Sequence, residues 1–569
     1  MTMTGWAQIA LLFALVLGAA FPLGAYIARL YNGERVFLTP VMAPFERGFY
    51  KLAGIDPNRQ MRWQDYAVAL LMLSAVHAGL LYAILRLQYY LPFNPQNIPG
   101  MAPNLAFNTA VSFLTNTNWQ AYAPESQISN GAQMFGLTVH MFLSAAAGIA
   151  AAGAMMRAFS GGHLTSLGNF YVDLTRIALY LLLPVSIIAA VLLLVAGVPQ
   201  TFAPFAVAHT LSGEPQTIAR GPVAFMEAIK EFGTNGGGFF NANSSHPFEN
   251  PSAATLLLEN WLLLVISFSL PITFGHIVKD RKQGIALFAA MAILLVLGVA
   301  GTYAAEAHGN ALQIAAGASP LHGNMEGKEM RFGSALTSMF NVSATGTSTG
   351  AIAGATDSFM PLGGLVPLFL MQLGEVTPGG VGSGFYTMIV FALLSVFVAG
   401  LMVGRTPEYQ GKKIQAKEIK LAMLAVLILT LFILGGAAFS LMTKSGLGSL
   451  ANAGPHGLSE MLYAWTSATE NNGSAMAGIS ANTNLLDYGL GAAMAFGRFA
   501  FLIPVLAIAG SLAAKPKLPP SAGTFPTTGP LFIGLLIGVI IILGGLQFMP
   551  ADTLGPVAEH YLLASGKLF

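Results

Sequence analysis

The sequence predicts an all-α, polytopic membrane protein. Of its 569 residues, 54% are hydrophobic and 9% are charged, whereas soluble domains carry roughly 25% charged residues. Runs of about 20 apolar residues, long enough to cross a ~30 Å hydrocarbon core, recur about ten times along the chain. These runs lie near 6–28, 67–87, 132–156, 173–197, 254–278, 284–304, 362–403 with a break, 419–442, 488–512 and 530–549.

Basic residues gather in alternate connections between these runs. The segments after the first, third, fifth, seventh and ninth runs hold most of the 26 Lys and Arg residues. The positive-inside rule therefore places these segments in the cytoplasm and both termini outside. The first run has no Lys or Arg before it, and Arg29 and Arg35 come after it. Because a cleaved signal peptide has its positive region first, we expect the first run to be a retained helix.

The composition also excludes several kinds of chemistry. The chain has no cysteine, so disulfides, thiolate metal sites and cysteine nucleophiles are not expected. It contains no HExxH motif and no G-x-x-x-x-G-K-[ST] phosphate loop, and its largest cytoplasmic segment, about 31–65, is too short for a nucleotide-binding domain. We expect a chain that is not an enzyme by itself and has no cofactor, with any ATP and Mg²⁺ bound by a partner subunit.

Four of the outside connections share one pattern, a short apolar stretch that ends in a polar Thr/Asn/Ser/Gly segment. They are "NLAFNTAVSFLTNTNWQAY" (104–122), "GPVAFMEAIKEFGTNGGGFF" (221–240), "MRFGSALTSMFNVSATGTSTGA" (330–351) and "GLSEMLYAWTSATENNGSAMAG" (457–478). Taking Gln120, Gly236, Gly350 and Gly473 as equivalent points, the spacings are 116, 114 and 123 residues. Such recurrence predicts four internal repeats with re-entrant pore helices too short to span a bilayer. The alternative is four ordinary outside loops with helices on the membrane surface.

The repeats divide the chain into six segments. Residues 1–64 form an N-terminal transmembrane helix and cytoplasmic loop, and residues 516–569 contain the C-terminal transmembrane helix. The four repeats of span, pore helix, filter loop and span between them are expected at 65–160, 161–282, 283–410 and 411–515.

The polar loops predict a central cation pathway. Non-helical backbone at membrane depth is tolerated where it lines a watery cavity, and rings of carbonyl oxygens can replace the hydration shell of a monovalent cation such as potassium. Inward-facing carbonyls often require positive φ, which glycine adopts freely, and the C-terminal ends of the pore helices favour a cation. The expected filter residues are Asn116, Thr117, Asn118, Gln120, Thr234, Asn235, Gly236, Ser348, Thr349, Gly350, Asn471, Asn472 and Gly473.

The filter register is open in two repeats. The first loop has no glycine between Thr115 and Gln120, and aligning its Asn118 with Asn235 sets Trp119 against Gly236. In the third loop either Gly346 or Gly350 fits the position of the key glycine.

Two features interrupt the predicted spans below this filter. The segment "LGEVTPGGVGSGF", 373–385, places one proline and five glycines in the seventh run, which should divide that helix around an intramembrane loop; a simple kink is the alternative. Arg498 lies about eleven residues into the ninth run, and a buried positive charge there would obstruct straight conduction of a cation. The expected gate or pathway residues are Arg498, Glu375, Gly379 and Gly380.

Other polar residues in or near the spans are expected to be structural. These are His77, His140, Glu259 and Asp357, which lie near the ends of spans or on helix faces.

The strings "LTNTNWQAY", "FGTNGGGFFNANSSHPFENP", "GEVTPGGVGSG" and "SATENNGSAMAG" resemble those of the KdpA family. Its members are the potassium-binding subunits of the bacterial Kdp potassium-transporting P-type ATPase, within a wider superfamily of potassium transporters. The likeness covers essentially the whole chain. It implies a bacterial plasma (inner) membrane location, a KdpB-like P-type ATPase partner, and accessory KdpC-like and small single-span KdpF-like subunits. It also implies that potassium passes sideways to the ATPase subunit through an intramembrane tunnel.

Two other functions compete with this pump subunit. A stand-alone Trk/Ktr-like potassium channel or transporter would share the fourfold repeat but should carry a glycine in every filter loop. A membrane-embedded enzyme would need convergent His, Asp or Glu residues on facing helices, which the sequence does not indicate.

Overall fold

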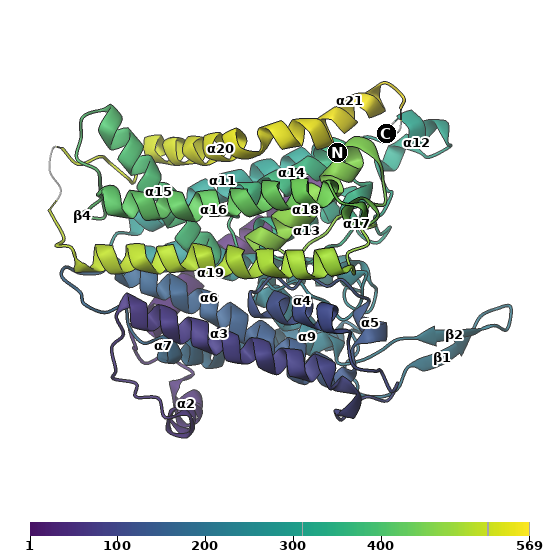
Figure 1. Cartoon of the computed structure of the whole chain (residues 1–569), viewed down its shortest axis with the longest axis horizontal. Coiled ribbons are helices and arrows are strands. Elements are labelled where there is room, and N and C mark those ends of the chain that lie inside the picture. The colour runs from purple at the N-terminus through teal and green to yellow at the C-terminus, as the bar shows by residue number, and fades with distance from the viewer. Residues whose placement is uncertain (310, 520–522, 568–569) are drawn as a thin grey trace.

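The computed structural model describes residues 1–309, 311–519 and 523–567. Ten helices among these residues are long and apolar enough to cross a membrane, in agreement with the sequence. They run side by side along the long axis of the molecule (Figure 1). They are α1 (Met3–Tyr31), α3 (Trp63–Arg86), η2 with α6 (Ala132–Arg157), α7 with η3 and α8 (Phe170–Val195), α10 (Ala253–Ile277), α11 (Arg281–Glu306), α15 (Ser383–Met402), α16 (Ala416–Leu441), α19 (Asn484–Ala514) and α20 with η7 and α21 (Pro530–Ala564).

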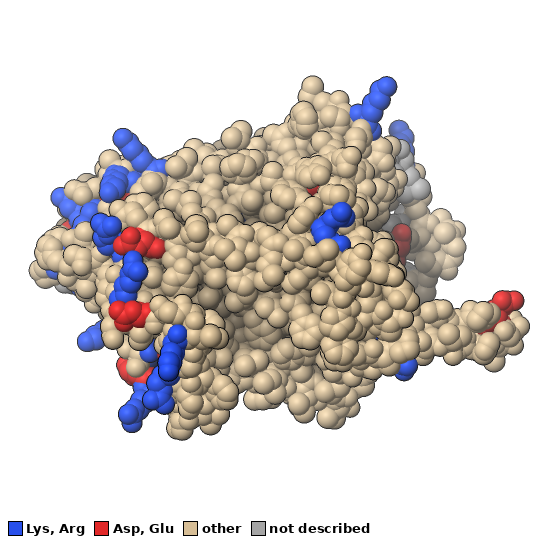
Figure 2. Space-filling model, turned by 60° about the horizontal axis from the view of Figure 1, so that its bottom comes forward, with Lys and Arg blue, Asp and Glu red and all other residues tan. Residues whose placement is uncertain are grey.

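The two termini lie at the same end of this bundle (Figure 1). Most of the visible Lys and Arg side chains gather at the opposite end, and the broad surface between the ends is almost free of charge (Figure 2). A wide uncharged belt between two polar ends is the surface that a multi-pass membrane protein presents to lipid.

Four short helices lie between consecutive spans, at the positions predicted for pore helices. They contain 12, 10, 14 and 17 residues and are α4 (Pro103–Leu114), α9 (Val223–Phe232), α13 (Gly333–Gly346) and α18 (Gly454–Glu470). At 1.5 Å per residue the longest extends about 26 Å, less than the ~30 Å hydrocarbon core. Each is followed by irregular backbone and then by another span.

The seventh apolar run is broken as predicted. Helix α14 (Pro361–Gln372) ends before the break, and α15 resumes at Ser383. A Cβ atom on Gly382 would overlap the carbonyl of Gly148 in α6, so the broken segment lies directly against the backbone of α6. Small residues permit such close approaches between membrane helices.

The remaining elements are short. One hairpin, β1 (Ala206–His209) with β2 (Pro215–Ile218), pairs His209 with Pro215 and projects from the end where the termini lie (Figure 1). The others are α2 (Thr39–Ala53), η1 (Gln88–Tyr90), α5 (Pro124–Gln127), η4 (Asn243–Ser245), α12 (Ala311–Ala315), η5 (Pro320–His322), η6 (Thr356–Ser358), β3 (Glu408–Tyr409), β4 (Lys412–Lys413) and α17 (Lys444–Leu447).

Candidate functional site: a ring of four loops

The loops that follow the first two pore helices are joined by side-chain amides. The Asn116 amide donates to the carbonyl oxygen of Thr234 at 3.0 Å, and the Asn235 amide donates to Asn116 Oδ1 at 2.7 Å. The Ser144 hydroxyl of α6 donates to the same Asn116 oxygen at 2.7 Å. All four residues are buried, so these bonds fix one loop against the other without help from solvent.

Further hydrogen bonds close the loops into a ring. The Gly350 N–H donates to the carbonyl of Asn235 at 3.3 Å, which joins the second loop to the third. The Ser348 hydroxyl donates to the carbonyl of Asn471 at 3.0 Å, and the Asn471 amide donates to Thr117 Oγ1 at 3.0 Å. The fourth loop therefore returns to the first, and the four loops surround one point.

Backbone conformation defines which residues are equivalent around this ring. In the first, second and fourth loops, two residues with positive φ are separated by one other residue. These pairs are Asn116 and Asn118, Thr234 and Gly236, and Asn471 and Gly473. In the third loop Ser348 has positive φ at the first position of this pattern. By this pattern Asn118 corresponds to Gly236, Gly350 and Gly473, spaced by 118, 114 and 123 residues. Asparagine tolerates the left-handed region better than other residues with a Cβ atom, which explains how the first loop dispenses with glycine.

The residue of the first loop that corresponds to Gly236, Gly350 and Gly473 is therefore Asn118, two residues before the expected Gln120. The Gln120 amide instead donates to the Gly238 carbonyl at 3.2 Å and to the Tyr122 hydroxyl at 3.3 Å. Gln120 thus supports the ring from the side, and the alternative that set Trp119 against Gly236 is also off by one residue.

Glycine is required at two places where the loops meet. A Cβ atom on Gly236 would overlap the backbone of Gly350, and one on Gly473 would overlap the carbonyl of Thr117. Their φ values of 91° and 95° also lie in the left-handed region, where an L side chain costs about 1–2 kcal/mol. Replacing either glycine with a residue that has a Cβ atom would therefore force neighbouring loops apart.

The remaining expected filter residues lie in the same buried region. The Asn472 amide donates to the carbonyl of Thr345 at 2.9 Å and to Glu375 Oε1 at 2.9 Å. The hydroxyl groups of Thr347 and Thr349 are 2.9 Å apart, which repeats the 2.7 Å contact between Thr115 and Thr117 in the first loop.

Asn118 has an unusual environment among these residues. Its side chain is 2% exposed, yet neither its amide nitrogen nor its amide oxygen has a hydrogen-bond partner in the described part of the chain. A buried amide without a partner costs free energy unless a ligand or a water satisfies it. The Asn118 amide is therefore available to contact a ligand or a water beside the ring.

A small cavity of about 30 Å³ connects the fourth loop to the expected gate residues. It is lined by Asn471, by Glu375 in the broken segment and by Arg498 of α19. The Arg498 guanidinium donates to the Tyr386 hydroxyl at 3.4 Å. Positive charge and buried carboxylate therefore line the same space at one side of the ring.

The glycines of the broken segment contact the third loop. The Gly379 N–H donates to the carbonyl of Gly346 at 2.7 Å, and a Cβ atom on Gly380 would meet the Ser348 side chain at 3.0 Å. The Val381 N–H donates to Thr234 Oγ1 at 3.0 Å. The break between α14 and α15 is thus packed against two of the four loops.

A second cavity of about 20 Å³ shares part of its lining with the first, including Gly374, Leu429, Glu470 and Phe501, and extends to Phe548 of α20. Both volumes exceed the ~10–15 Å³ that one water needs. The first cavity borders the fourth loop and the second borders the C-terminal helix α20.

Comparisons with known proteins agree with this architecture. A model of the family described as Potassium-transporting ATPase A subunit, KdpA, matches residues 10–561. The chain belongs to the KdpA family. Potassium-transporting ATPase potassium-binding subunits of Allorhizobium ampelinum and Beijerinckia indica subsp. indica are each 56% identical to it, over 100% and 99% of both chains. That of Methylorubrum extorquens is 54% identical, over 100% of this chain and 99% of the relative.

The fold also resembles a solved structure outside the family. The potassium transporter TrkH from Vibrio parahaemolyticus superposes with a TM-score of 0.51 at 16% identity, covering 88% of this chain and 98% of TrkH. At this identity the likeness concerns the fold alone, a multi-pass bundle of membrane helices.

This KdpA-family chain also contains a charged network that the sequence did not reveal. Lys230, in α9, is 0% exposed and its ammonium lies 2.9 Å from Glu227, 3.3 Å from Glu231 and 2.8 Å from Glu249. Glu249 also accepts the Phe240 N–H at 2.7 Å. The network therefore ties the chain that leaves the second filter loop back to its pore helix.

The same lysine holds the loop through its backbone. Its carbonyl accepts the N–H groups of Asn235 at 2.8 Å and Gly236 at 3.2 Å, and the Asn243 amide donates to the Gly236 carbonyl at 2.7 Å. The spacing of Lys230 and Glu227 on one helix face was the single available signal in the sequence, because Glu249 lies nineteen residues away.

The rings of His77 and His140 contact each other, with centroids 5.3 Å apart. His140 contacts the carbonyls of Gly136 at 2.8 Å and His77 at 3.1 Å through its two ring nitrogens. Glu259, by contrast, is fully buried close to Glu227 and Glu231 and joins the charged region behind the second loop.

Proposed function

We propose that this chain is the potassium-binding and translocating subunit of an ATP-driven, high-affinity potassium uptake pump. The observation that carries the proposal is the closed ring of four loops, in a chain that belongs to the KdpA family. The relatives named above are potassium-binding subunits of a potassium-transporting ATPase.

In this proposal the ring is a channel-like selectivity filter. Potassium exchanges its hydration shell for neutral oxygens of the four loops, with the Asn118 amide oxygen as a further ligand. The ring contains no carboxylate, so potassium is held by dipoles and can leave again. Each pore helix ends within a few residues of the ring, and the partial negative charge at its C-terminus favours the cation.

The route beyond the filter turns sideways. Arg498 opposes straight passage of a cation, while the two adjoining cavities lead from Asn471 and Glu375 toward α20. This arrangement supports transfer of potassium through an intramembrane tunnel to a partner P-type ATPase subunit. Glu375, Gly379 and Gly380 act as the gate of that route because they pack against the filter loops.

The partner supplies the energy. ATP and Mg²⁺ are bound by the KdpB-like subunit, and KdpC-like and KdpF-like subunits complete the complex. The basic end of the molecule faces the cytoplasm of the bacterium, so the termini and the filter entrance face outward from the inner membrane.

Potassium-stimulated ATP hydrolysis by the purified complex tests the filter. Gly473→Ala forces the fourth loop away from Thr117, and a strain of about 1.4 kcal/mol corresponds to a tenfold change in affinity. We expect the half-saturating potassium concentration to rise about tenfold, with sodium and rubidium competing better. Gly534→Ala in α20 is the matched control, because a Cβ atom there meets nothing within 4 Å. Equal potassium affinity and selectivity in both variants would refute the filter.

A second experiment separates the pump from a stand-alone channel. The chain alone and the chain with its ATPase subunit are reconstituted in liposomes, and potassium uptake is followed with and without ATP. We expect ATP-dependent uptake in the complex only. Steady potassium flux through the chain alone would instead support the Trk/Ktr-like alternative.

A further inference from the structure

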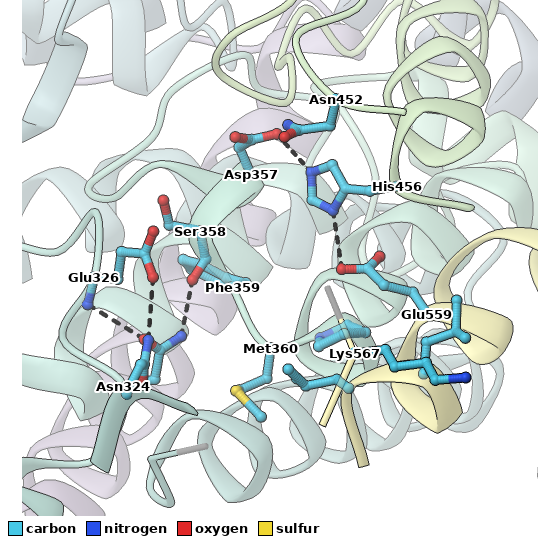
Figure 3. Close-up of a pocket in the computed structure, with 14 residues that line it drawn as sticks. Asn324, Glu326, Asp357, Ser358, Phe359, Met360, Asn452, His456, Glu559 and Lys567 are labelled. Carbon is cyan, nitrogen blue, oxygen red and sulfur yellow. Dashed lines mark hydrogen bonds and ion pairs between the residues drawn. The ribbon is translucent and has the colours of Figure 1, made fainter. Parts of the chain in front are cut away.

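A second cluster of potential ligands lies away from the filter, at the start of the fourth pore helix. His456 stands in the first turn of α18 and borders a pocket of about 230 Å³. Asp357 comes from η6, beyond the third filter loop, and Glu559 comes from α21. Figure 3 shows the imidazole between these two carboxylates, so three segments far apart in the sequence meet at one histidine.

The imidazole is held through both ring nitrogens. Its Nδ1 lies 2.9 Å from Glu559 Oε1, and its Nε2 lies 2.8 Å from Asp357 Oδ1 and 3.9 Å from Glu460 Oε1. Because carboxylate oxygens only accept, both ring N–H groups donate here, Nδ1–H to Glu559 and Nε2–H to Asp357. A metal ion that replaces the Nε2 proton would lie between this nitrogen and two carboxylates. Histidines that bind metals typically donate their other ring N–H to a carboxylate in this way.

Glu460 is positioned by the backbone around it. Its Oε2 accepts the Ala451 N–H at 2.9 Å, and its Oε1 accepts the Asn452 N–H at 3.1 Å and the Asn452 amide at 2.8 Å. The carboxylate is fully buried and is held by these three hydrogen bonds. Its fixed orientation leaves Oε1 on the side of His456.

We propose that His456 Nε2, Asp357 and Glu460 bind a divalent transition-metal ion of the Zn²⁺ class, with Glu559 orienting the imidazole. The three ligand atoms lie within 4.8 Å of one another. Tetrahedral zinc with bonds of about 2.0–2.1 Å separates its ligands by roughly 3.4 Å. The distances of 2.8 and 3.9 Å from Nε2 to the Asp357 and Glu460 carboxylates bracket this value.

The pocket completes the coordination. Its lining includes Asp357, His456 and Glu559, with Lys567 on the same side as Glu559 and Glu326 on the far side (Figure 3). Solvent entering from it provides the fourth ligand, as in zinc sites with three protein ligands. Imidazole selects zinc, copper or nickel over calcium and magnesium, which prefer sites made of oxygens alone.

A metal here would join the outer ends of three elements. Asp357 follows the third filter loop, His456 and Glu460 begin the pore helix that leads to the fourth, and Glu559 belongs to the C-terminal helix. Bound metal therefore clamps the outer side of the third and fourth repeats. This inference does not depend on potassium transport.

Titration calorimetry on the whole metal-stripped complex tests the site, with Zn²⁺ and Ca²⁺ as the probes. We expect one Zn²⁺ per chain and no comparable heat from Ca²⁺. His456→Gln should weaken binding more than about 100-fold, and Glu559→Gln should weaken it about 10–100-fold, the range for outer-shell partners. His209→Gln, in the projecting hairpin, is the matched control and should bind Zn²⁺ as the unaltered chain does.

Asp357→Asn is a second variant that tests the site without relying on the folding of His456→Gln. Its amide can still hydrogen-bond with His456. We expect it to fold and to lose most of the Zn²⁺ affinity. Zinc K-edge absorption of the loaded complex should show one imidazole and otherwise oxygen ligands. The proposal is overturned if His209→Gln abolishes binding, if the Asp357 and His456 variants bind as the unaltered chain does, if Ca²⁺ binds equally well, or if no Zn²⁺ binds. In the last case the cluster is an ion-pair clamp only.

Discussion

Lys230→Met tests most directly whether the buried ion pairs of Lys230 stabilise the second filter loop. The substitution removes one buried ammonium that lies within 3.3 Å of three buried carboxylates. Breaking a buried ion pair by removing one partner costs about 3–5 kcal/mol. Because Glu227, Glu231 and Glu249 all lose the same cation, we expect a loss near the upper end, about 5 kcal/mol.

The loss is measured as the free energy of unfolding of the purified complex in mixed detergent and SDS micelles. Lys51→Met, at an exposed lysine of α2, is the control and should change stability by no more than about 0.5 kcal/mol. Potassium-stimulated ATP hydrolysis is followed in parallel. We expect Lys230→Met to raise the half-saturating potassium concentration, because Glu249 then no longer holds the end of the second loop.

A double-mutant cycle assigns the effect to the ion pairs. In a Glu227→Gln background one carboxylate is already neutral, so Lys230→Met should cost less than it does in the unaltered chain. A loss below about 1 kcal/mol, or an equal loss in both backgrounds, would refute the assignment of Lys230 as the common partner of these carboxylates.

Three further predictions concern the filter, the pathway and the cytoplasmic end. Asn118→Gly keeps the left-handed backbone but removes the unpartnered amide, so we expect weaker potassium activation of ATP hydrolysis; unchanged activation would exclude the amide as a ligand. Arg498→Ala should increase the ATP hydrolysed per potassium ion transported in liposomes, and an unchanged ratio would remove its blocking role. Burial acts to raise the pKa of Glu46, but hydrogen bonds from Tyr180 and Arg176 outweigh it and lower that pKa. Ionised Glu46 therefore stabilises the fold above about pH 4.3, its ordinary value, and this contribution of about 1–2 kcal/mol disappears as the pH falls through the lowered pKa. Glu46→Gln should be less stable at neutral pH but equal the unaltered chain in strong acid, and a constant difference would contradict this.

Much of the architecture could be predicted because it follows from local properties of the sequence. The ten spans follow from apolar length, and the four pore helices follow from the spacing of their Thr/Asn/Gly segments. The break after Gln372 follows from one proline among glycines. Each of these signals lies within a few tens of residues, where composition and periodicity are informative.

The filter register could not be predicted because backbone conformation decides it. Spacing and polarity favour Gln120, whereas Asn118 has the left-handed conformation of Gly236 and Gly473. The tolerance of asparagine for the left-handed region was the available signal in "TNTNWQ", but which residue meets the other three loops depends on how the loops pack together.

The charged clusters depend on tertiary contacts. Glu249 reaches Lys230 across the whole filter loop, and His456 meets Asp357 and Glu559 from two other elements. As single residues they resemble ordinary helix-end charges. Their significance comes from burial and from partners that sequence distance conceals.

The position of the bound cation tests the central claim most directly. Tl⁺ is a heavy monovalent cation of potassium's charge and similar size, and its anomalous scattering can be located in crystals of the complex. We predict a peak at the centre of the ring formed by Asn118, Gly236, Gly350 and Gly473, displaced by excess potassium. If Tl⁺ binds elsewhere in the chain and not in the ring, the result would contradict the assignment of the ring as the potassium filter.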